Sequence, residues 1–305
     1  MSNTLLGGAI GDALGVFAEG KPSNNPLLLS WDQKSFLGSQ HHKLEPGQYS
    51  DDTMMSLAVA QSLIDNNGFN PDDLSKRYVE LFTSNTIRGY GKTTLMAISN
   101  LIKGFHWSES GIAGSYGNGT AMRAAPFGIY FRHDLSALIK VATIDAQITH
   151  VSDEALAGSI AIALTAACAI NNDTDKLLER IYPYLPDSKV KSTIYILSSL
   201  LDAPNISPSF ALAFLGTKAD VRETVPSALY LFMKYDNYRQ AVLAAINAGN
   251  DTDTTASIVG SLFGAKYGMR DIPSYWTDQV EDRDRLIILD SQLYNRSNNS
   301  YMKVQ

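Results

Sequence analysis

The sequence predicts an all-α protein, and three observations lead to this fold class. Ala- and Leu-rich segments with helical periodicity recur along the chain, whereas the period-two alternation of strands is nearly absent. Hydrophobic residues make up 45% of the 305 residues, which is enough for a sizeable core. No repeat, low-complexity tract or linker divides the chain. We therefore expect one compact domain over residues 1–305, with a core of about 5–276 followed by a C-terminal helix and a frayed tail.

The first predicted helix covers residues 5–18 and carries Gly7, Gly11 and Gly15 at four-residue spacing. On a helix these glycines form one smooth stripe that another backbone can approach closely. We interpret Asp12 as a structural acid, hydrogen-bonded inside the fold. Glu19 lies just beyond this helix and could enter a cleft.

Residues 20–48 are predicted to form an irregular loop, because prolines, glycines and asparagines recur there. A loop of this length in a compact domain is often functional, for instance as a lid. The adjacent His41 and His42 have no further His or Cys at ligand spacing, so we interpret them as solvated loop residues.

The next stretch, 54–104, is predicted to be helical with breaks at Pro71 and at residues 88–91. A glycine-dense turn follows at 111–119 and could present backbone N–H groups to phosphate. It lacks the Lys-Ser/Thr ending of a nucleotide-hydrolysing P-loop. His150 lies at the entrance of an apolar helix over 155–170, where a lone histidine is more often structural than catalytic.

The later chain is also predicted to be helical, over 175–201 and 282–293. Pro226 is placed in the first turn of another helix, where proline is tolerated. The run 155–170 is shorter than the ~20 residues that span a bilayer, so it is predicted to be a core helix.

Carboxylates gather at the entrances of two predicted helices that lie two hundred residues apart. Asp51 and Asp52 precede one helix, and Asp251 and Asp253 precede the other. One acid would suffice to cap each helix, and two caps without a metal remain the alternative. Four carboxylates with hydroxyl neighbours are the hard oxygen ligands that Mg²⁺ or Mn²⁺ prefers, so one metal site built from both ends of the chain is the hypothesis we favour.

Composition limits the classes of function. The net charge of −6 leaves no basic footprint for nucleic acid. The single cysteine, Cys168, excludes a disulfide framework and favours a reducing compartment. No secretory signal or membrane span is predicted, so we expect a soluble, cytoplasmic protein and no membrane partner.

The motifs together resemble the ADP-ribosylglycohydrolase family, which includes dinitrogenase-reductase activating glycohydrolase. The resemblance covers residues 5 to about 276. It is carried by Gly11-Asp12-Ala13-Leu14-Gly15 with Glu19, Ser50-Asp51-Asp52-Thr53, Gly117-Asn118-Gly119 with Met122-Arg123, Thr149-His150, and Asp251-Thr252-Asp253-Thr254, all in the family's order. Arg88-Gly89-Tyr90-Gly91 and Ser115-Tyr116-Gly117-Asn118-Gly119 are most similar to the branch that cleaves serine-linked ADP-ribose and poly(ADP-ribose).

The resemblance implies an orthogonal helical bundle with two Mg²⁺ or Mn²⁺ ions at the base of a cleft. One ion would be held by Ser50, Asp51, Asp52 and Asp253, and the other by Asp52, Asp251, Asp253 and Thr254. Ser50 replaces a more usual Thr, and Asn250 replaces what is often a second glycine. Glu19 would act as a gating or acid–base residue, and Asp52 would position or activate water. The substrate's diphosphate would be bound by Ser115, Tyr116, Gly117, Asn118 and Gly119, with His150 lining the cleft.

The implied activity is hydrolysis of the C1″ bond of ADP-ribose on protein side chains, in poly(ADP-ribose) or in O-acetyl-ADP-ribose, by a monomeric enzyme. Four hypotheses of function compete. The serine-type branch is preferred to the arginine-specific one. A non-catalytic, crystallin-like or ADP-ribose-binding relative is disfavoured because all four acids are present. A di-metal phosphohydrolase is disfavoured because the motifs of the candidate site contain no His-Asp metal pairs.

Overall fold

Two helices from opposite ends of the sequence, α1 (Thr4–Gly15) and α15 (Thr252–Tyr267), pack against each other at the centre of the fold. The computed structural model describes residues 2–84, 86 and 88–302, and the side chains of 298–302 lie outside this description. Every residue of α1 is buried. A Cβ on Gly7 would lie 2.3 Å from the Gly260 oxygen, and one on Gly11 would lie 2.1 Å from the Ala256 oxygen. The predicted glycine stripe therefore lets the two helix backbones pack in direct contact.

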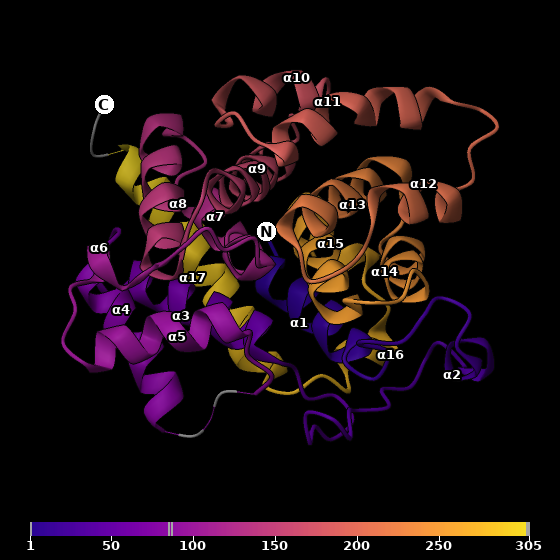
Figure 1. The fold of residues 1–305 in the computed structure, drawn as a ribbon, viewed down its shortest axis with the longest axis horizontal. Helices are drawn as coiled ribbons and strands as arrows, with labels where there is room; N and C mark the ends of the chain where they lie inside the picture. Colours follow the sequence, from indigo (N-terminus) through magenta and orange to yellow (C-terminus); the bar gives the residue numbers. More distant parts are fainter. Residues whose placement is uncertain (1, 85, 87, 303–305) are drawn as a thin grey trace.

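The remaining helices surround this pair, and the all-α prediction is confirmed (Figure 1). They are α2 (Pro26–Ser30), α3 (Asp51–Asp65), α4 (Pro71–Thr83), α5 (Lys92–Ile102), α6 (Trp107–Ser110), α7 (Ala125–Tyr130), α8 (Leu135–Thr149), α9 (Asp153–Ile170), α10 (Leu177–Ile181), α11 (Lys189–Asp202), α12 (Pro208–Leu215), α13 (Val221–Lys234), α14 (Tyr238–Asn247), α16 (Ser274–Thr277) and α17 (Arg283–Met302), with 3₁₀ turns η1 (Asn118–Thr120), η2 (Tyr182–Tyr184) and η3 (Gly268–Asp271). In the described part of the chain, the only sheet pairs β1 (Ile112–Ala113) with β2 (His150–Val151) in parallel. Figure 1 shows α3–α6 and α12–α14 on opposite sides of α1, which makes one compact domain.

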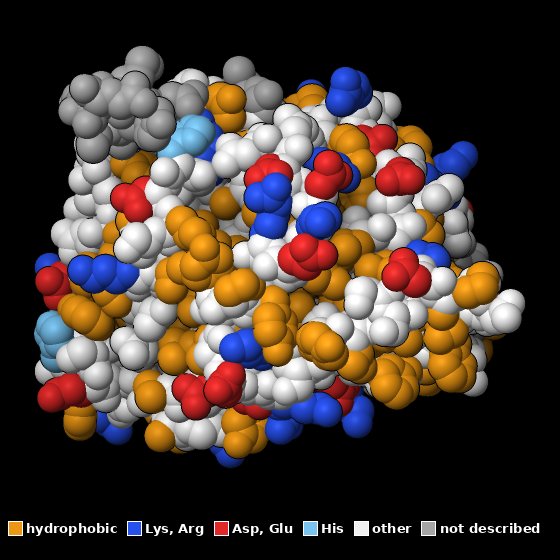
Figure 2. Space-filling model, turned by 90° about the horizontal axis from the view of Figure 1, so that it is seen from above, with side chains coloured by type: hydrophobic (Ala, Val, Ile, Leu, Met, Phe, Trp, Pro, Cys, Tyr) orange, Lys and Arg blue, Asp and Glu red, His pale blue; other side chains and the backbone are white. Residues whose placement is uncertain are grey.

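Helix α9 is the only helix in the described residues that is long and apolar enough to cross a membrane by length and composition. However, 72% of it is buried inside the fold, where it contacts α7, α8, α13 and α15. It is a core helix, as predicted. Figure 2 shows the molecule of Figure 1 from above. On this face, acidic and basic side chains are interspersed among hydrophobic ones, without a large basic area.

Prolines account for two wrong predictions of helix position. Pro226 lies inside α13 and not in its first turn, because the helix begins earlier, where the Asp220 side chain accepts a hydrogen bond from Arg222 N. The helix predicted over 175–201 is divided into α10, η2 and α11, with Pro183 inside the 3₁₀ turn. The stretch expected to be frayed after residue 293 is helical as far as Met302.

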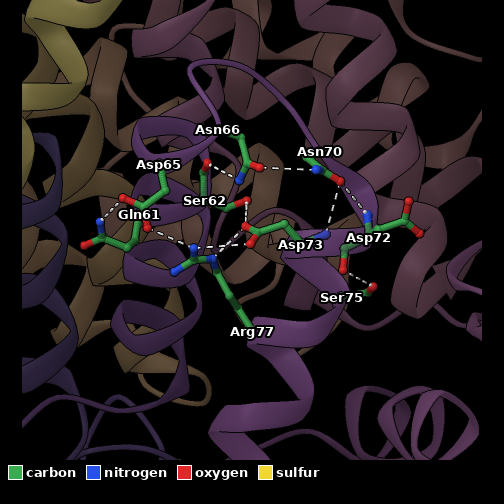
Figure 3. Close-up of polar contacts among 9 residues, drawn as sticks. All are labelled: Gln61, Ser62, Asp65, Asn66, Asn70, Asp72, Asp73, Ser75 and Arg77. Carbon is green, nitrogen blue, oxygen red and sulfur yellow. Dashed lines mark hydrogen bonds and ion pairs between the residues drawn. The ribbon is translucent and has the colours of Figure 1, made fainter.

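The corner between α3 and α4 is held by a polar network (Figure 3). Asn70 Oδ1 accepts from the backbone N–H groups of Asp72 and Asp73 and so caps α4. Arg77 joins the two helices by donating to Asp73 Oδ2 at 2.7 Å and to Asp65 Oδ2 at 2.9 Å. These acids are paired with a cation in the fold itself, unlike those at the opposite end of α3.

The C-terminal helix closes the N-terminus of α1. The side chain of Asn3, the cap residue of α1, makes no capping hydrogen bond. Instead, the buried Asp290 of α17 accepts from Leu5 N at 3.0 Å and Leu6 N at 3.2 Å. Burial raises the pKa of Asp290 to about 7.

Candidate active site

A cavity of about 390 Å³ opens where the N-terminal ends of α3, α5, η1 and α15 meet. Its walls come from segments far apart in sequence. They are Glu19, His42, Asp51, Asp52, Gly89, Tyr90, Gly91, Lys92, Thr93, Thr94, Gly117, Asn118, Gly119, Met122, His150, Ala219, Asp251, Asp253 and Thr254. A larger cavity, of about 890 Å³, lies beyond residues 216–218, but Glu223 is the one acid among its lining residues. We therefore take the smaller cavity, where acids converge, as the candidate site.

The first two acids are freed from helix capping by Asp12. The Asp12 carboxylate accepts from Ser50 N at 3.0 Å, Thr53 N at 3.1 Å and Thr53 Oγ1 at 2.6 Å. This buried acid closes the start of α3, which confirms its structural role, and burial raises its pKa to about 6. Asp51 and Asp52 can consequently face the cavity.

The loop before α15 orients the second pair of acids. Asp251 occupies the cap position of α15, but its side chain makes no capping hydrogen bond. Asn250 adopts the left-handed conformation with φ +63°, which asparagine tolerates, so the replacement of glycine preserves the turn. The loop is fixed by Asn250 N donating to Lys21 O at 2.7 Å and by Asp251 N donating to Thr217 O at 2.9 Å.

The four aspartates thus line one cavity, and each is buried. No ion pair joins any of them to a Lys or Arg in the part of the chain that the structure describes. Burial is the main reason that the pKa values of Asp51, Asp52 and Asp253 are raised well above the usual range, and repulsion between neighbouring acids adds to it. Burial also raises the pKa of Asp251. A bound cation would offset the cost of placing these carboxylate charges close together in a buried cavity.

The donor atoms fit a divalent metal. Asp52 Oδ2 accepts from Ser50 Oγ and from Thr254 Oγ1, both at 3.3 Å. Asp52 Oδ1 is buried and has no hydrogen-bond partner among the described residues. Carboxylate oxygens of Glu19, Asp251 and Asp253 lie within 4.8 Å of one another. Hard oxygen donors at this density suit Mg²⁺ or Mn²⁺.

Two of the predicted ligands with hydroxyl groups differ in position. Thr254 lines the cavity. Ser50 lies behind the lining, where its Oγ both accepts from Asp52 N and donates to the Asp52 carboxylate. The structure therefore brings Ser50 to Asp52 but not to the cavity wall.

The prediction that His42 is a solvated loop residue is wrong. Its side chain is only 16% exposed, lines the cavity, and its Nε2 is hydrogen-bonded to Glu19 Oε2. This hydrogen bond is the main reason that the pKa of His42 is raised. His41 remains exposed, as expected. Only the fold brings the 38–44 loop to Glu19, so the two adjacent histidines were the one sequence signal for this contact.

The glycine-rich turn supplies a wall of the cavity that adjoins Asp251. Gly117, Asn118 and Gly119 line the cavity, and Asn118 Nδ2 donates to Asp251 Oδ2. The other two predicted phosphate-binding residues lie outside the lining. Ser115 Oγ is 2.8 Å from Thr93 Oγ1, and the Tyr116 ring lies beneath the Arg222 guanidinium at 4.2 Å.

Several lining residues escaped the sequence analysis. Lys92, Thr93 and Thr94 open α5 and reach the cavity from its first turn. Gly91, which precedes this helix without a side-chain cap, was the available signal. His150, by contrast, lines the cavity as the resemblance implies, in addition to standing at a helix entrance.

The chain is a glycosidic-bond hydrolase, because it belongs to the ADP-ribosylglycohydrolase family, whose model matches residues 2–301. The match extends over nearly the full length of the chain, which confirms the resemblance found in the motifs.

Known proteins of the same kind align along most of the chain. It is 25% identical to human ADP-ribosylhydrolase ARH3, over 95% of this chain and 91% of that protein. It is 26% identical to ADP-ribosylarginine hydrolase Tri1 of Pseudomonas putida (strain GB-1), over 96% of this chain and 77% of that one. The solved structure of an ADP-ribosylglycohydrolase-related protein complex superimposes with a TM-score of 0.80 at 27% identity, covering 97% of this chain and 96% of that chain.

Proposed function

We propose that this protein uses divalent cations to hydrolyse the C1″ glycosidic bond of ADP-ribose attached to serine side chains of proteins, and the related bonds in poly(ADP-ribose) and O-acetyl-ADP-ribose. The observation that carries the proposal is the buried, unpartnered Asp52 Oδ1 among three further buried aspartates in one cavity. A buried carboxylate oxygen without a donor is costly unless an ion or ligand completes it.

The cations would be two Mg²⁺ or Mn²⁺ ions, held by Asp51, Asp52, Asp251, Asp253 and Thr254, with Ser50 supporting Asp52. When bound, such ions orient sugar hydroxyls and lower the pKa of water. Cleavage at C1″ develops oxocarbenium-like charge on the ribose, and the anionic wall favours this charge.

The chain's own residues then have separate tasks. Glu19 lies at the edge of the acidic group with a third of its side chain exposed, so it is suited to exchange a proton with the reacting oxygen. Asp52 Oδ1 is an acceptor that can orient or activate water. The backbone N–H groups of Asn118 and Gly119 open the 3₁₀ turn and have no acceptor within it, so they suit the diphosphate.

Arginine-linked ADP-ribose is the second candidate substrate, because the chain is as similar to the Tri1 arginine hydrolase as to the human protein. An arginine leaving group is cationic and would be attracted by the same acids. Serine linkage is preferred on the motifs at 88–91 and 115–119.

One experiment tests both parts of the proposal. Purified protein is incubated with serine-linked, arginine-linked and polymeric ADP-ribose, in Mg²⁺, in Mn²⁺ and in excess chelator. We expect release of ADP-ribose from the serine-linked substrate that requires a divalent ion. Release from the arginine-linked substrate alone would overturn the linkage, and full activity in chelator would overturn the role of the metal.

We also propose that the protein acts as a monomer in the cytoplasm. The supporting observations are a net charge of −6 and a single, half-buried Cys168. Light scattering during size-exclusion chromatography tests the oligomeric state, since a dimer would elute at twice the mass of 33.3 kDa.

A further inference from the structure

A fully buried arginine joins the glycine-rich turn to the histidine of the cavity. Arg123 is paired with Asp145 at 2.9 Å, and both side chains have no exposed surface. Its other donors reach Gly119 O at 2.9 Å and Thr149 Oγ1 at 2.8 Å. Tyr78 completes the network by donating to Asp145 Oδ1 at 2.7 Å. The guanidinium is therefore held rigidly between the turn and the residue before His150.

The Thr149 hydroxyl transmits this arrangement to His150. Thr149 Oγ1 lies 2.8 Å from His150 Nδ1 as well as 2.8 Å from the Arg123 guanidinium. Arginine has donors only, so the hydroxyl oxygen accepts from Arg123. In the described part of the chain, the remaining hydrogen-bond partner of this hydroxyl is His150 Nδ1, so its own hydrogen points there. A nitrogen that accepts a hydrogen bond carries no proton, and the proton of the neutral ring is then on Nε2.

The Nε2 atom faces the glycine-rich turn. A Cβ on Gly117 would lie 2.9 Å from Nε2, and one on Gly119 would lie 3.1 Å from Cε1 of the same ring. Glycine at 117 therefore leaves the space for the ring, and glycine at 119 relieves a tight contact, so that the ring can lie directly against the turn. His150 is 2% exposed and lines the cavity, yet its Nε2 has no hydrogen-bond partner among the described residues.

We propose that the Arg123–Thr149 chain of hydrogen bonds fixes His150 as the neutral Nε2–H tautomer, which makes it a donor to an oxygen of the ligand held over Gly117 and Gly119. Arg123 and Thr149 are positioning residues that act through His150. The ligand group is an anionic or hydroxyl oxygen, and its assignment to the diphosphate or ribose of ADP-ribose rests on the proposed function. The assignment of the tautomer does not.

Two further observations agree with this role. The ring lines the cavity, and Nε2 has no protein acceptor among the described residues, so it can donate to a ligand there. Burial, reinforced by the Arg123 charge, lowers the pKa of His150 to about 3, so the ring is neutral at physiological pH.

The tautomer is measured by long-range ¹⁵N–¹H spectra of protein labelled at histidine, without any substrate. The sequence has five histidines, and a His150→Gln variant identifies the signal of His150 by its loss. We expect the pattern of a neutral ring protonated at Nε2 from pH 5.5 to 8. A ring protonated at Nδ1, or a charged ring at pH 7, would overturn the proposal.

The role of the hydroxyl is tested with Thr149→Val and its conservative control Thr149→Ser. Valine keeps the shape but cannot donate to Nδ1, so we expect a mixture of tautomers and ADP-ribose binding weakened about tenfold by calorimetry, equivalent to about 1.4 kcal/mol. Serine should retain both wild-type properties. An unchanged tautomer in the valine variant, or its loss in the serine variant, contradicts the proposed chain.

The failure of this inference can be told apart from failure of the proposed function. If the wild-type protein binds no ADP-ribose but His150 is the neutral Nε2–H form, the ligand is wrong and the tautomer stands. If ADP-ribose binds but the ring carries its proton on Nδ1, the positioning proposal is wrong and the function stands. If the valine variant does not fold, the wild-type spectrum and the serine variant still decide the outcome.

Discussion

Gly15 lies so close to Asp253 that a Cβ at position 15 would be 2.5 Å from the Asp253 Cα. The N-terminal helix thus forms a supporting surface beneath the second pair of acids, and the Thr252 hydroxyl adds a hydrogen bond to Gly15 O at 2.8 Å. The glycine stripe therefore sets the position of the candidate metal ligands, in addition to packing the core.

Gly15→Ala should weaken both the fold and the binding of Mg²⁺. Alanine is favoured over glycine in a helix, so any loss of stability reports the collision with the Asp253 backbone. We expect a loss of about 1–3 kcal/mol in the free energy of unfolding by urea, together with weaker Mg²⁺ binding by calorimetry.

The matched control is Gly8→Ala, on the same helix. Its Cβ would meet the Ser261 Oγ at 2.3 Å, but this atom belongs to a side chain that can rotate away. Stability should fall less in this variant, and Mg²⁺ affinity should be unchanged. Equal losses of Mg²⁺ affinity in the two variants would show that helix packing in general, and not the contact with Asp253, determines the site.

Asp253→Asn should stabilise the metal-free protein while abolishing activity. Burial first, and then repulsion from Asp251, Glu19 and Asp52, makes the charged form of Asp253 costly and raises its pKa. A neutral amide of the same shape removes this cost, so we expect the metal-free variant to be about 1–3 kcal/mol more stable than the wild type. It should also lose the rise in melting temperature that Mg²⁺ gives the wild type.

Thermal unfolding with and without Mg²⁺, beside the release of ADP-ribose, measures these effects. A variant that is less stable than the metal-free wild type, or one that Mg²⁺ still stabilises fully, would contradict the assignment of Asp253 as a ligand.

The parts of the fold that were predictable depend on local pattern. The glycines at 7, 11 and 15 indicated a close helix contact, and the doubled acids at 51–52 and 251–253 indicated more than caps. Both inferences needed only spacing within one segment. The structure confirms the helix contact and brings the acids to one cavity.

The parts that were missed depend on contacts between distant segments. His42 is twenty-three residues from Glu19, and its loop position gave no sign of their hydrogen bond. Arg123 was noted only as part of a motif, although it links Gly119 to Thr149. Pro226 was placed wrongly because Asp220 starts its helix six residues earlier. Side-chain partners of this kind are fixed by tertiary packing, which spacing along the chain does not reveal.

Stability should fall as pH rises through the titration of Asp290, and Asp290→Asn should flatten this dependence. The folded-state pKa of about 7 is above the ordinary value of 3.8, so the folded protein binds more protons than the unfolded chain between these pH values. The free energy of unfolding therefore decreases as pH rises from about 4 to about 7, by up to a few kcal/mol.

Urea denaturation at pH 5 and pH 8 for the wild type and for Asp290→Asn measures the effect of this group. The other buried carboxylates contribute to the slope in both proteins, so the informative quantity is the difference between the two slopes. We expect a smaller decrease in the variant, and identical slopes would show that Asp290 ionises normally against the N-terminus of α1.

Glu19→Ala should slow turnover much more than it weakens ADP-ribose binding. Glu19 stands between His42, which is bonded to its Oε2, and the carboxylates of Asp251 and Asp253. This location favours contact with the reacting end of the substrate, while the glycine-rich turn holds the diphosphate. Loss of a proton-transfer group typically costs about 10²–10⁴ in rate, so we expect kcat to fall by this factor while the Kd for ADP-ribose changes little.

His42→Ala provides the comparison, because it leaves the Glu19 carboxylate in place and removes only its hydrogen-bond partner. This variant should lower kcat by a smaller factor. If affinity and turnover fell together in Glu19→Ala, Glu19 would be a residue that positions the substrate, and proton transfer would have to be assigned to Asp52.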